Sequence, residues 1–175
     1  MTHRTRFARL VLSAALIITG CSTAPSPQPS VAADAPQLVG AWRSKVTFRS
    51  GPLAEMKGLE FLYAYNAGGT MTESSNYDEA ENSSPPAYGV WKQINARTFE
   101  TKYLFYTTQA PGPGDGTKGN RDWWPAGHGE LAETITMADD GQTYTSTITL
   151  ALFDRTNAPI AGGGQGTGAG ARIGF

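Results

Sequence analysis

From Leu38 onward, apolar and polar side chains alternate with a period of two, and β-branched and aromatic residues are enriched. In the first such run, Trp42, Val46 and Phe48 share one face, and charged or polar side chains occupy most positions between them. This pattern is typical of strands that are half buried on one face. Since no stretch shows a convincing helical period, we predict an all-β domain.

Turn-forming residues divide this part of the chain into about eight strands. Asp139-Asp140-Gly141 is the strongest hairpin signal, and glycines in Ala67-Gly68-Gly69 tolerate the positive φ of a tight turn. The predicted strands start with the run at Trp42 and continue over 59–66, 70–75, 89–94, 98–108, 130–137, 142–153 and 162–173. Eight antiparallel strands in a meander close readily into an up-and-down barrel whose interior is filled or holds one small ligand. We expect residues 38–175 to form this barrel.

Two insertions interrupt the meander, the acidic segment 76–87 and the glycine-rich segment 110–129. We predict that both are loops. Long loops at a barrel mouth often carry specificity.

The first 20 residues do not belong to the barrel. A basic segment with Arg4, Arg6 and Arg9 precedes an apolar run over 10–18, which is too short to span a bilayer permanently. We interpret residues 1–20 as an export signal. Residues 21–37 are rich in Pro, Ser and Ala without apolar periodicity, which predicts a flexible linker.

The signal ends in Ile18-Thr19-Gly20-Cys21, which resembles the bacterial lipobox. The resemblance implies cleavage before Cys21, a diacylglycerol on its sulfur and acylation of the new amino terminus. Each buried methylene contributes about 0.8 kcal/mol, so two or three chains anchor stably. We therefore expect a lipoprotein of the cell envelope, on the periplasmic side of the outer membrane if the cell is Gram-negative. An ordinary secretory signal with a chance cysteine is the alternative.

Charge and composition argue against several kinds of partner and binding site. Without residues 1–20 the chain has 11 basic and 15 acidic side chains, a formal charge of −4, which argues against a nucleic-acid partner. Cys21 is the single cysteine, so neither a disulfide nor a thiolate metal site is expected. We expect no cofactor and no metal.

Candidates for acid and base catalysis are few. His128 falls in the predicted loop 110–129, where a lone histidine is more often solvated than catalytic. Glu130 and Glu133 lie on opposite faces of one strand and cannot form a pair. Glu73 lies near the acidic residues of segment 76–87, which we interpret as a solvated rim. No catalytic residue is assigned.

Gly40-Ala41-Trp42 at the start of the first strand, together with Arg172 in the last, resembles the calycin group, which includes lipocalins, fatty-acid-binding proteins and avidins. The resemblance implies that Trp42 plugs the closed end of the barrel and that Arg172 packs across its indole ring, a cation–π contact of roughly 0.5 to 2 kcal/mol. The resemblance extends over roughly residues 38–175, most of the chain that follows the signal, and is nearest to small exported bacterial lipocalin-like proteins. A second Gly-x-Trp, Gly89-Val90-Trp91, also opens a strand, and Trp91 is either a second core plug or a cavity wall.

The last strand has glycine at alternate positions from Gly162 to Gly170, so one of its faces lacks side chains. Either aromatic rings from neighbouring strands or a ligand lie against this face, or the tail is flexible.

Three functions remain open. The first is a barrel that binds a small apolar or amphipathic ligand. The second is an interaction or inhibitor module with a filled barrel and an envelope protein as partner. The third is a barrel-type cyclase or isomerase that uses His128 or a cavity carboxylate as base. Candidate ligand-binding residues for the first are Tyr63, Tyr65, Trp91, Tyr103, Phe105, Trp123 and Trp124.

Overall fold

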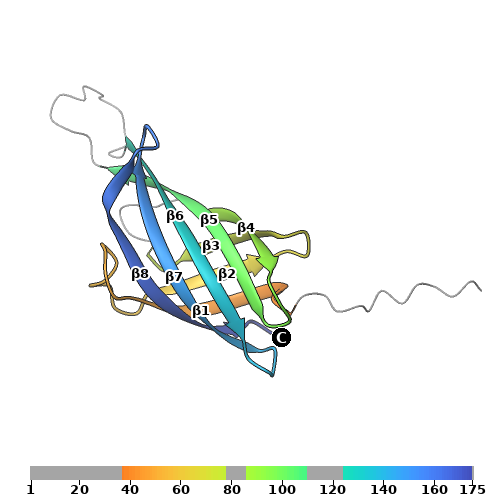
Figure 1. The fold of residues 1–175 in the computed structure, drawn as a ribbon. Coiled ribbons are helices and arrows are strands. Elements are labelled where there is room, and N and C mark those ends of the chain that lie inside the picture. Colours follow the sequence, from red (N-terminus) through yellow and green to blue (C-terminus); the bar gives the residue numbers. More distant parts are fainter. Residues whose placement is uncertain (1–36, 78–85, 110–123, 175) are drawn as a thin grey trace, which may run out of the picture. The chain divides into compact units, whose positions relative to one another are not determined.

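The computed structural model describes residues 37–77, 86–109 and 124–174, and these form one closed antiparallel barrel (Figure 1). Neighbouring strands are consecutive in the chain, and β1 pairs with β8 to close the sheet. The prediction of an eight-stranded all-β barrel is confirmed. The strands are β1 (Gly40–Phe48), β2 (Glu60–Tyr65), β3 (Thr70–Ser75), β4 (Ala87–Gln93), β5 (Thr98–Gln109), β6 (Trp124–Met137), β7 (Thr143–Asp154) and β8 (Pro159–Arg172).

Several predictions fall outside the described residues. They concern the signal 1–20, the lipid attachment at Cys21, nearly all of the linker 21–37, and Trp123. Within the described ranges, no helix has the length and apolarity needed to cross a membrane.

The predicted loop 110–129 is wrong at its C-terminal end, because β6 begins at Trp124 rather than at Glu130. β5 continues to Gln109, so residues 124–129 find a partner strand, with a register shift between Thr107 and Thr108. Gly127 makes this possible: it has φ of 148°, and a Cβ there would lie 2.0 Å from the Phe153 carbonyl oxygen. Smaller shifts place the start of β4 at residue 87 and that of β8 at residue 159.

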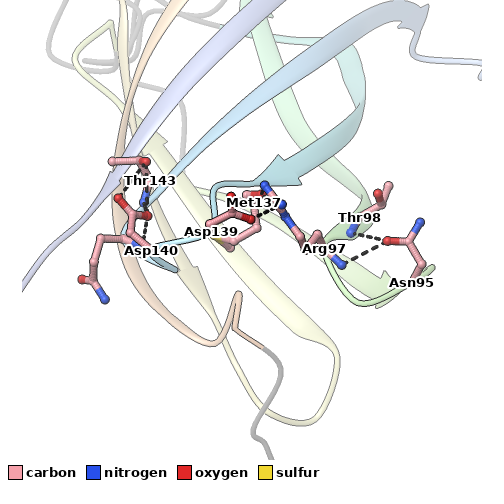
Figure 2. Close-up of polar contacts among 8 residues, drawn as sticks. Asn95, Arg97, Thr98, Met137, Asp139, Asp140 and Thr143 are labelled. Atoms are coloured by element: carbon pink, nitrogen blue, oxygen red, sulfur yellow. Dashed lines mark hydrogen bonds and ion pairs between the residues drawn. The ribbon is translucent and has the colours of Figure 1, made fainter.

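One end of the barrel, called the turn end here, has short connections between strands. Figure 2 shows how side chains fix two of them. Arg97 donates from Nε and Nη2 to the Met137 carbonyl, at 2.8 and 2.7 Å, and pairs with Asp139. Asn95 Oδ1 accepts the amides of Arg97 and Thr98, and Asp140 caps the next turn by accepting the amides of Gln142 and Thr143. Hydrogen bonds of this type are the usual reason that Asn and Asp favour turns.

The opposite end, called the loop end, carries the longer connections. Residues 49–59 join β1 to β2 there, and Leu53 and Met56 of this connection pack against the core, with Leu59 buried beside them. Side chains that face inward are fully buried through most of the barrel but only half buried near this end, at Phe105 and Leu152. The interior therefore comes closest to the surface at the loop end.

The bare face of β8 points into the barrel, where Gly164, Gly166, Gly168 and Gly170 are all buried. A Cβ at Gly170 would lie 2.2 Å from the Tyr144 ring, and one at Gly166 would lie 3.2 Å from the Phe48 ring. Aromatic rings of neighbouring strands thus occupy the space that glycine leaves, which was one of the two alternatives for an ordered strand.

We expect Gly170→Ala to destabilise the protein by about 1 to 3 kcal/mol, because the new methyl group collides with a ring that the barrel wall holds in place. Urea unfolding measures the change. Gly68→Ala is the matched control: no atom lies within 4 Å of its Cβ position, and a change of at most about 0.5 kcal/mol is expected. Equal stabilities of the two variants would contradict the packing described here.

Candidate functional site

Trp42 lies at the turn end and is completely buried. Its indole Nε1–H donates to the Leu38 carbonyl at 2.8 Å, and its ring contacts Tyr144 with centroids 5.1 Å apart. The Arg172 guanidinium carbon lies 4.3 Å from the Trp42 ring centroid, and the same side chain donates to the carbonyls of Val39 and Gln37. This is the geometry that the resemblance implies for the closed end.

Gly40 is needed for this arrangement. It has φ of 132°, and a Cβ there would lie 2.6 Å from Arg172 Nη1. A side chain would therefore push the guanidinium off the ring. The contribution of the Gly40, Trp42 and Arg172 group to barrel closure stays a prediction.

Trp91 also packs at the turn end and is 8% exposed. Its indole Nε1–H donates to the Asn66 carbonyl at 3.0 Å, and its ring makes edge contacts with Tyr65 and Phe99. In both Gly-x-Trp sequences, the indole ring thus packs in the core and its N–H donates to a backbone carbonyl. The glycine of the second, Gly89, lies against Tyr103 and the Lys102 carbonyl, where a Cβ would come within 2.4 and 2.2 Å.

The centre of the barrel contains a group of buried polar side chains, called the polar cluster here. Hydrophobic residues surround it, among them Phe61 and Ile135. Six strands supply its members, because one or two inward positions on each of β1, β2, β3, β5, β6 and β7 have a hydroxyl or a carboxylate. The members are Ser44, Tyr63, Tyr65, Glu73, Thr101, Tyr103, Glu133, Tyr144 and Ser146.

Glu133 is the central member and is 2% exposed. It faces inward because β6 alternates, and it shares its face with Leu131 and Ile135, whereas Glu130 faces outward and pairs with Lys102 at 2.6 Å. Burial raises the pKa of Glu133 from 4.5 to about 7, and the nearby hydroxyls of Ser146 and Tyr63 offset only part of this rise. Neither carboxylate oxygen has a hydrogen-bond partner of ordinary geometry among the described residues.

The tyrosine hydroxyls form the wall of the cluster. Those of Tyr63 and Tyr103 are hydrogen bonded at 3.0 Å, and the Tyr63 ring stacks on that of Tyr65 with centroids 5.5 Å apart. Burial raises the pKa of both Tyr63 and Tyr103 well above the usual value, and the Glu133 carboxylate raises it further. The phenols therefore remain neutral donors at physiological pH.

Several hydroxyl oxygens in the cluster resemble those of the Glu133 carboxylate in their hydrogen bonding. Within the described part of the chain, those of Ser44, Tyr65, Thr101, Tyr144 and Ser146 are buried without a partner of ordinary hydrogen-bond geometry. A Cβ added to Gly168 would lie 2.5 Å from Ser146 Oγ, 3.0 Å from Ser44 Oγ and 3.5 Å from Glu133 Oε1. The bare strand β8 is thus what allows these oxygens to converge on one point.

The interpretation of Glu73 as a rim residue is wrong, because Glu73 lies in β3, faces inward and is 7% exposed. Met71 shares its face, and the period of two from Met71 was the signal that could have placed Glu73 inside. The sequence analysis correctly predicted that Glu133 and Glu130 lie on opposite faces of one strand, but it did not identify Glu133 as a site residue. A carboxylate among Leu131, Ile135 and Met137 on an apolar face was the available signal.

His128 is also placed differently from the prediction. It lies in β6 rather than in a loop, and its ring stacks on Phe153 with centroids 4.8 Å apart and an interplanar angle of 6°. Its Nε2 lies 3.8 Å from Glu130 Oε1, on the outward side of β6. It is therefore not brought to the polar cluster.

Most of the predicted ligand-binding residues lie in the barrel interior, but only some of them belong to the polar cluster. Tyr63, Tyr65, Trp91 and Tyr103 are buried, and Phe105 is half buried with its ring over Gly129. Trp124 lies at the start of β6, partly exposed and opposite Gln109. Tyr63, Tyr65 and Tyr103 belong to the polar cluster, and Trp91 and Phe105 lie outside it. A ligand-binding role for these residues stays a prediction.

Comparison with known proteins adds no family assignment. No protein-family model matches the chain, and no curated protein is detectably similar to it in sequence. Among the described residues, no group of three or more His, Cys, Asp or Glu side chains could hold a metal ion.

Proposed function

We propose that this chain is a lipid-anchored protein of the cell envelope whose barrel binds a small amphipathic molecule. Apolar groups of the ligand would contact the aromatic side chains between the polar cluster and the loop end, such as Phe105. Its polar group would reach the cluster. An eight-stranded barrel of this kind is compatible with one small ligand.

The observation that carries the proposal is a set of buried oxygens, above all those of Glu133, that have no hydrogen-bond partner of ordinary geometry among the described residues. Buried polar groups in folded proteins are nearly always hydrogen bonded, to protein, to ordered water or to a bound molecule. A carboxylate held in an apolar surrounding costs more than a hydroxyl. A ligand that satisfies several of these groups at once would recover free energy that the protein alone lacks.

Native mass spectrometry tests this proposal. The full-length protein is purified from its own envelope in a mild detergent, and the intact mass is compared before and after denaturation. We expect one small molecule that is lost on denaturation, on top of a covalent lipid mass that remains. A native mass equal to the denatured mass would argue against ligand carriage.

The anchor is tested separately. We expect Cys21→Ser to move the protein from the membrane fraction to the soluble fraction, because no acyl chain can then be attached through a thioether. Fractionation and mass spectrometry of the amino-terminal peptide measure the change, and Ser22→Ala is the control. Membrane retention of the Cys21→Ser protein would contradict lipid anchoring.

A second candidate function is a barrel-type isomerase or cyclase, and Glu133 is the observation in its favour. A carboxylate with a pKa of about 7 beside the Tyr63 hydroxyl has the properties of a general base with a neighbouring donor. Incubation of the protein with the molecule found by mass spectrometry distinguishes the two functions. A carrier leaves that molecule unchanged, whereas an isomerase or cyclase converts it into an isomer of the same mass, which chromatography separates from the starting molecule.

A further inference from the structure

In the described ranges, the side chains buried in the barrel that can carry a charge near neutral pH are two carboxylates. Glu133 and Glu73 are both buried, and all Lys and Arg side chains in the described ranges are exposed except Arg172. Arg172 is half buried, but it lies over Trp42 at the turn end and donates to backbone carbonyls. Thus no cation of the described residues serves as partner to the central carboxylate.

Among the described residues, the groups around Glu133 are neutral or acidic. β2 contributes the Tyr63 and Tyr65 hydroxyls, β3 contributes Glu73, and β8 contributes only the bare Gly168. The remaining neighbours are hydroxyls of Ser44 on β1, Thr101 and Tyr103 on β5, and Tyr144 and Ser146 on β7. Such a surrounding gives the cluster a negative potential and offers oxygen acceptors.

A buried carboxylate is stable when it is paired with an opposite charge and hydrogen bonded. A compact ammonium group has three N–H donors and one positive charge. It therefore matches a site where two carboxylate oxygens and several hydroxyl oxygens converge and, within the described residues, lack hydrogen-bond partners of ordinary geometry. A carboxylate or phosphate ligand would instead add a like charge to a buried acidic group.

We propose that the polar cluster binds the protonated amine of an amphipathic molecule, with the Glu133 carboxylate as its counter-charge. The Ser44 and Ser146 hydroxyls accept the remaining N–H groups, and Gly168 leaves the space beside these oxygens free of a side chain. The inference rests on the proposed function, because it names the chemical class of the ligand for the same interior.

The test uses three probes with one aromatic ring and different head groups: 2-phenylethylamine, 2-phenylethanol and 3-phenylpropanoate. Binding to the full-length protein is measured by calorimetry at pH 8. We expect the amine to bind at least about tenfold more tightly than the carboxylate, with the alcohol between them. Preference for the carboxylate, or equal affinities for all three, would overturn the inference and leave ligand binding intact. No binding by any probe would count against both proposals.

Glu133→Gln keeps the shape of the side chain and removes its charge. We expect it to abolish the preference for the amine, whereas Glu130→Gln, on the outer face of the same strand, retains that preference. Binding of the amine by the unchanged protein should weaken about tenfold between pH 8 and pH 6, because Glu133 becomes protonated with a pKa of about 7. A Glu133→Gln protein that still prefers the amine would place the counter-charge elsewhere and overturn the assignment.

Discussion

Replacement of Trp42 by alanine will lower the free energy of unfolding by about 3 to 5 kcal/mol. The indole is completely buried, donates to the Leu38 carbonyl, contacts Tyr144 and carries the Arg172 guanidinium on its face. Its removal leaves a large cavity at the turn end and takes away the ring under a positive charge. Urea unfolding followed by near-ultraviolet circular dichroism measures the loss.

Trp124→Ala is the control for this prediction. Trp124 lies at the far end of the barrel and is partly exposed, so its loss should cost about 1 kcal/mol or less. If the two substitutions lower stability equally, the contacts of Trp42 at the turn end do not stabilise the barrel as predicted. If Trp42→Ala unfolds the protein altogether, Trp42→Phe, which keeps a ring and loses the N–H donor, provides a measurable intermediate.

Replacement of Glu133 by glutamine will have an effect that depends on pH. The folded state holds the Glu133 proton more tightly than the unfolded chain, since burial raises the pKa from 4.5 to about 7. Stability of the ligand-free protein should therefore fall as pH rises from 4.5 to 7, by an amount on the order of 3 kcal/mol. The glutamine variant lacks this loss, so its advantage should be absent near pH 4 and complete at pH 8.

Urea unfolding at a series of pH values measures this difference, with Glu130→Gln as the control. Glu130 faces outward and pairs with Lys102, and its loss should shift stability by less than about 1 kcal/mol. A constant difference between the Glu133→Gln protein and the unchanged protein at all pH values would show that Glu133 is not an uncompensated buried carboxylate.

The closed barrel was predictable because its strands alternate cleanly. The residues that share a face with Trp42, from Ser44 to Phe48, turn inward as the period of two requires. The glycines of β8 likewise all fall on the inner face from Gly164 to Gly170. Hairpin residues such as Asp140 and Asn95 mark turns through bonds to the nearest amides, which is a local property of the sequence.

The start of β6 was not predictable from local pattern. Pro125 and Gly127 favour a loop, and only the extension of β5 to Gln109 provides the partner that makes this segment a strand. Tertiary pairing thus overrides local preference there.

The polar cluster was missed for a different reason. Charged side chains are ordinarily exposed, so Glu73 was assigned to the surface although its position in the alternation places it inside. Convergence of residues from separate strands, such as Ser44, Glu133 and Ser146, depends on the shear of the closed sheet and on the space left by Gly168. The sequence therefore does not predict that these side chains lie close together in the folded barrel.

The most direct test of the central claim is the titration of Glu133 in the ligand-free protein by carbon-13 NMR of its side-chain carboxyl, assigned by the signal that disappears in Glu133→Gln. If Glu133 is a buried carboxylate without a cationic partner, its pKa should be about 7. Addition of 2-phenylethylamine should lower this pKa, because the ammonium group stabilises the charged carboxylate. A pKa near 4.5 in the free protein, unchanged by the amine, would contradict the account.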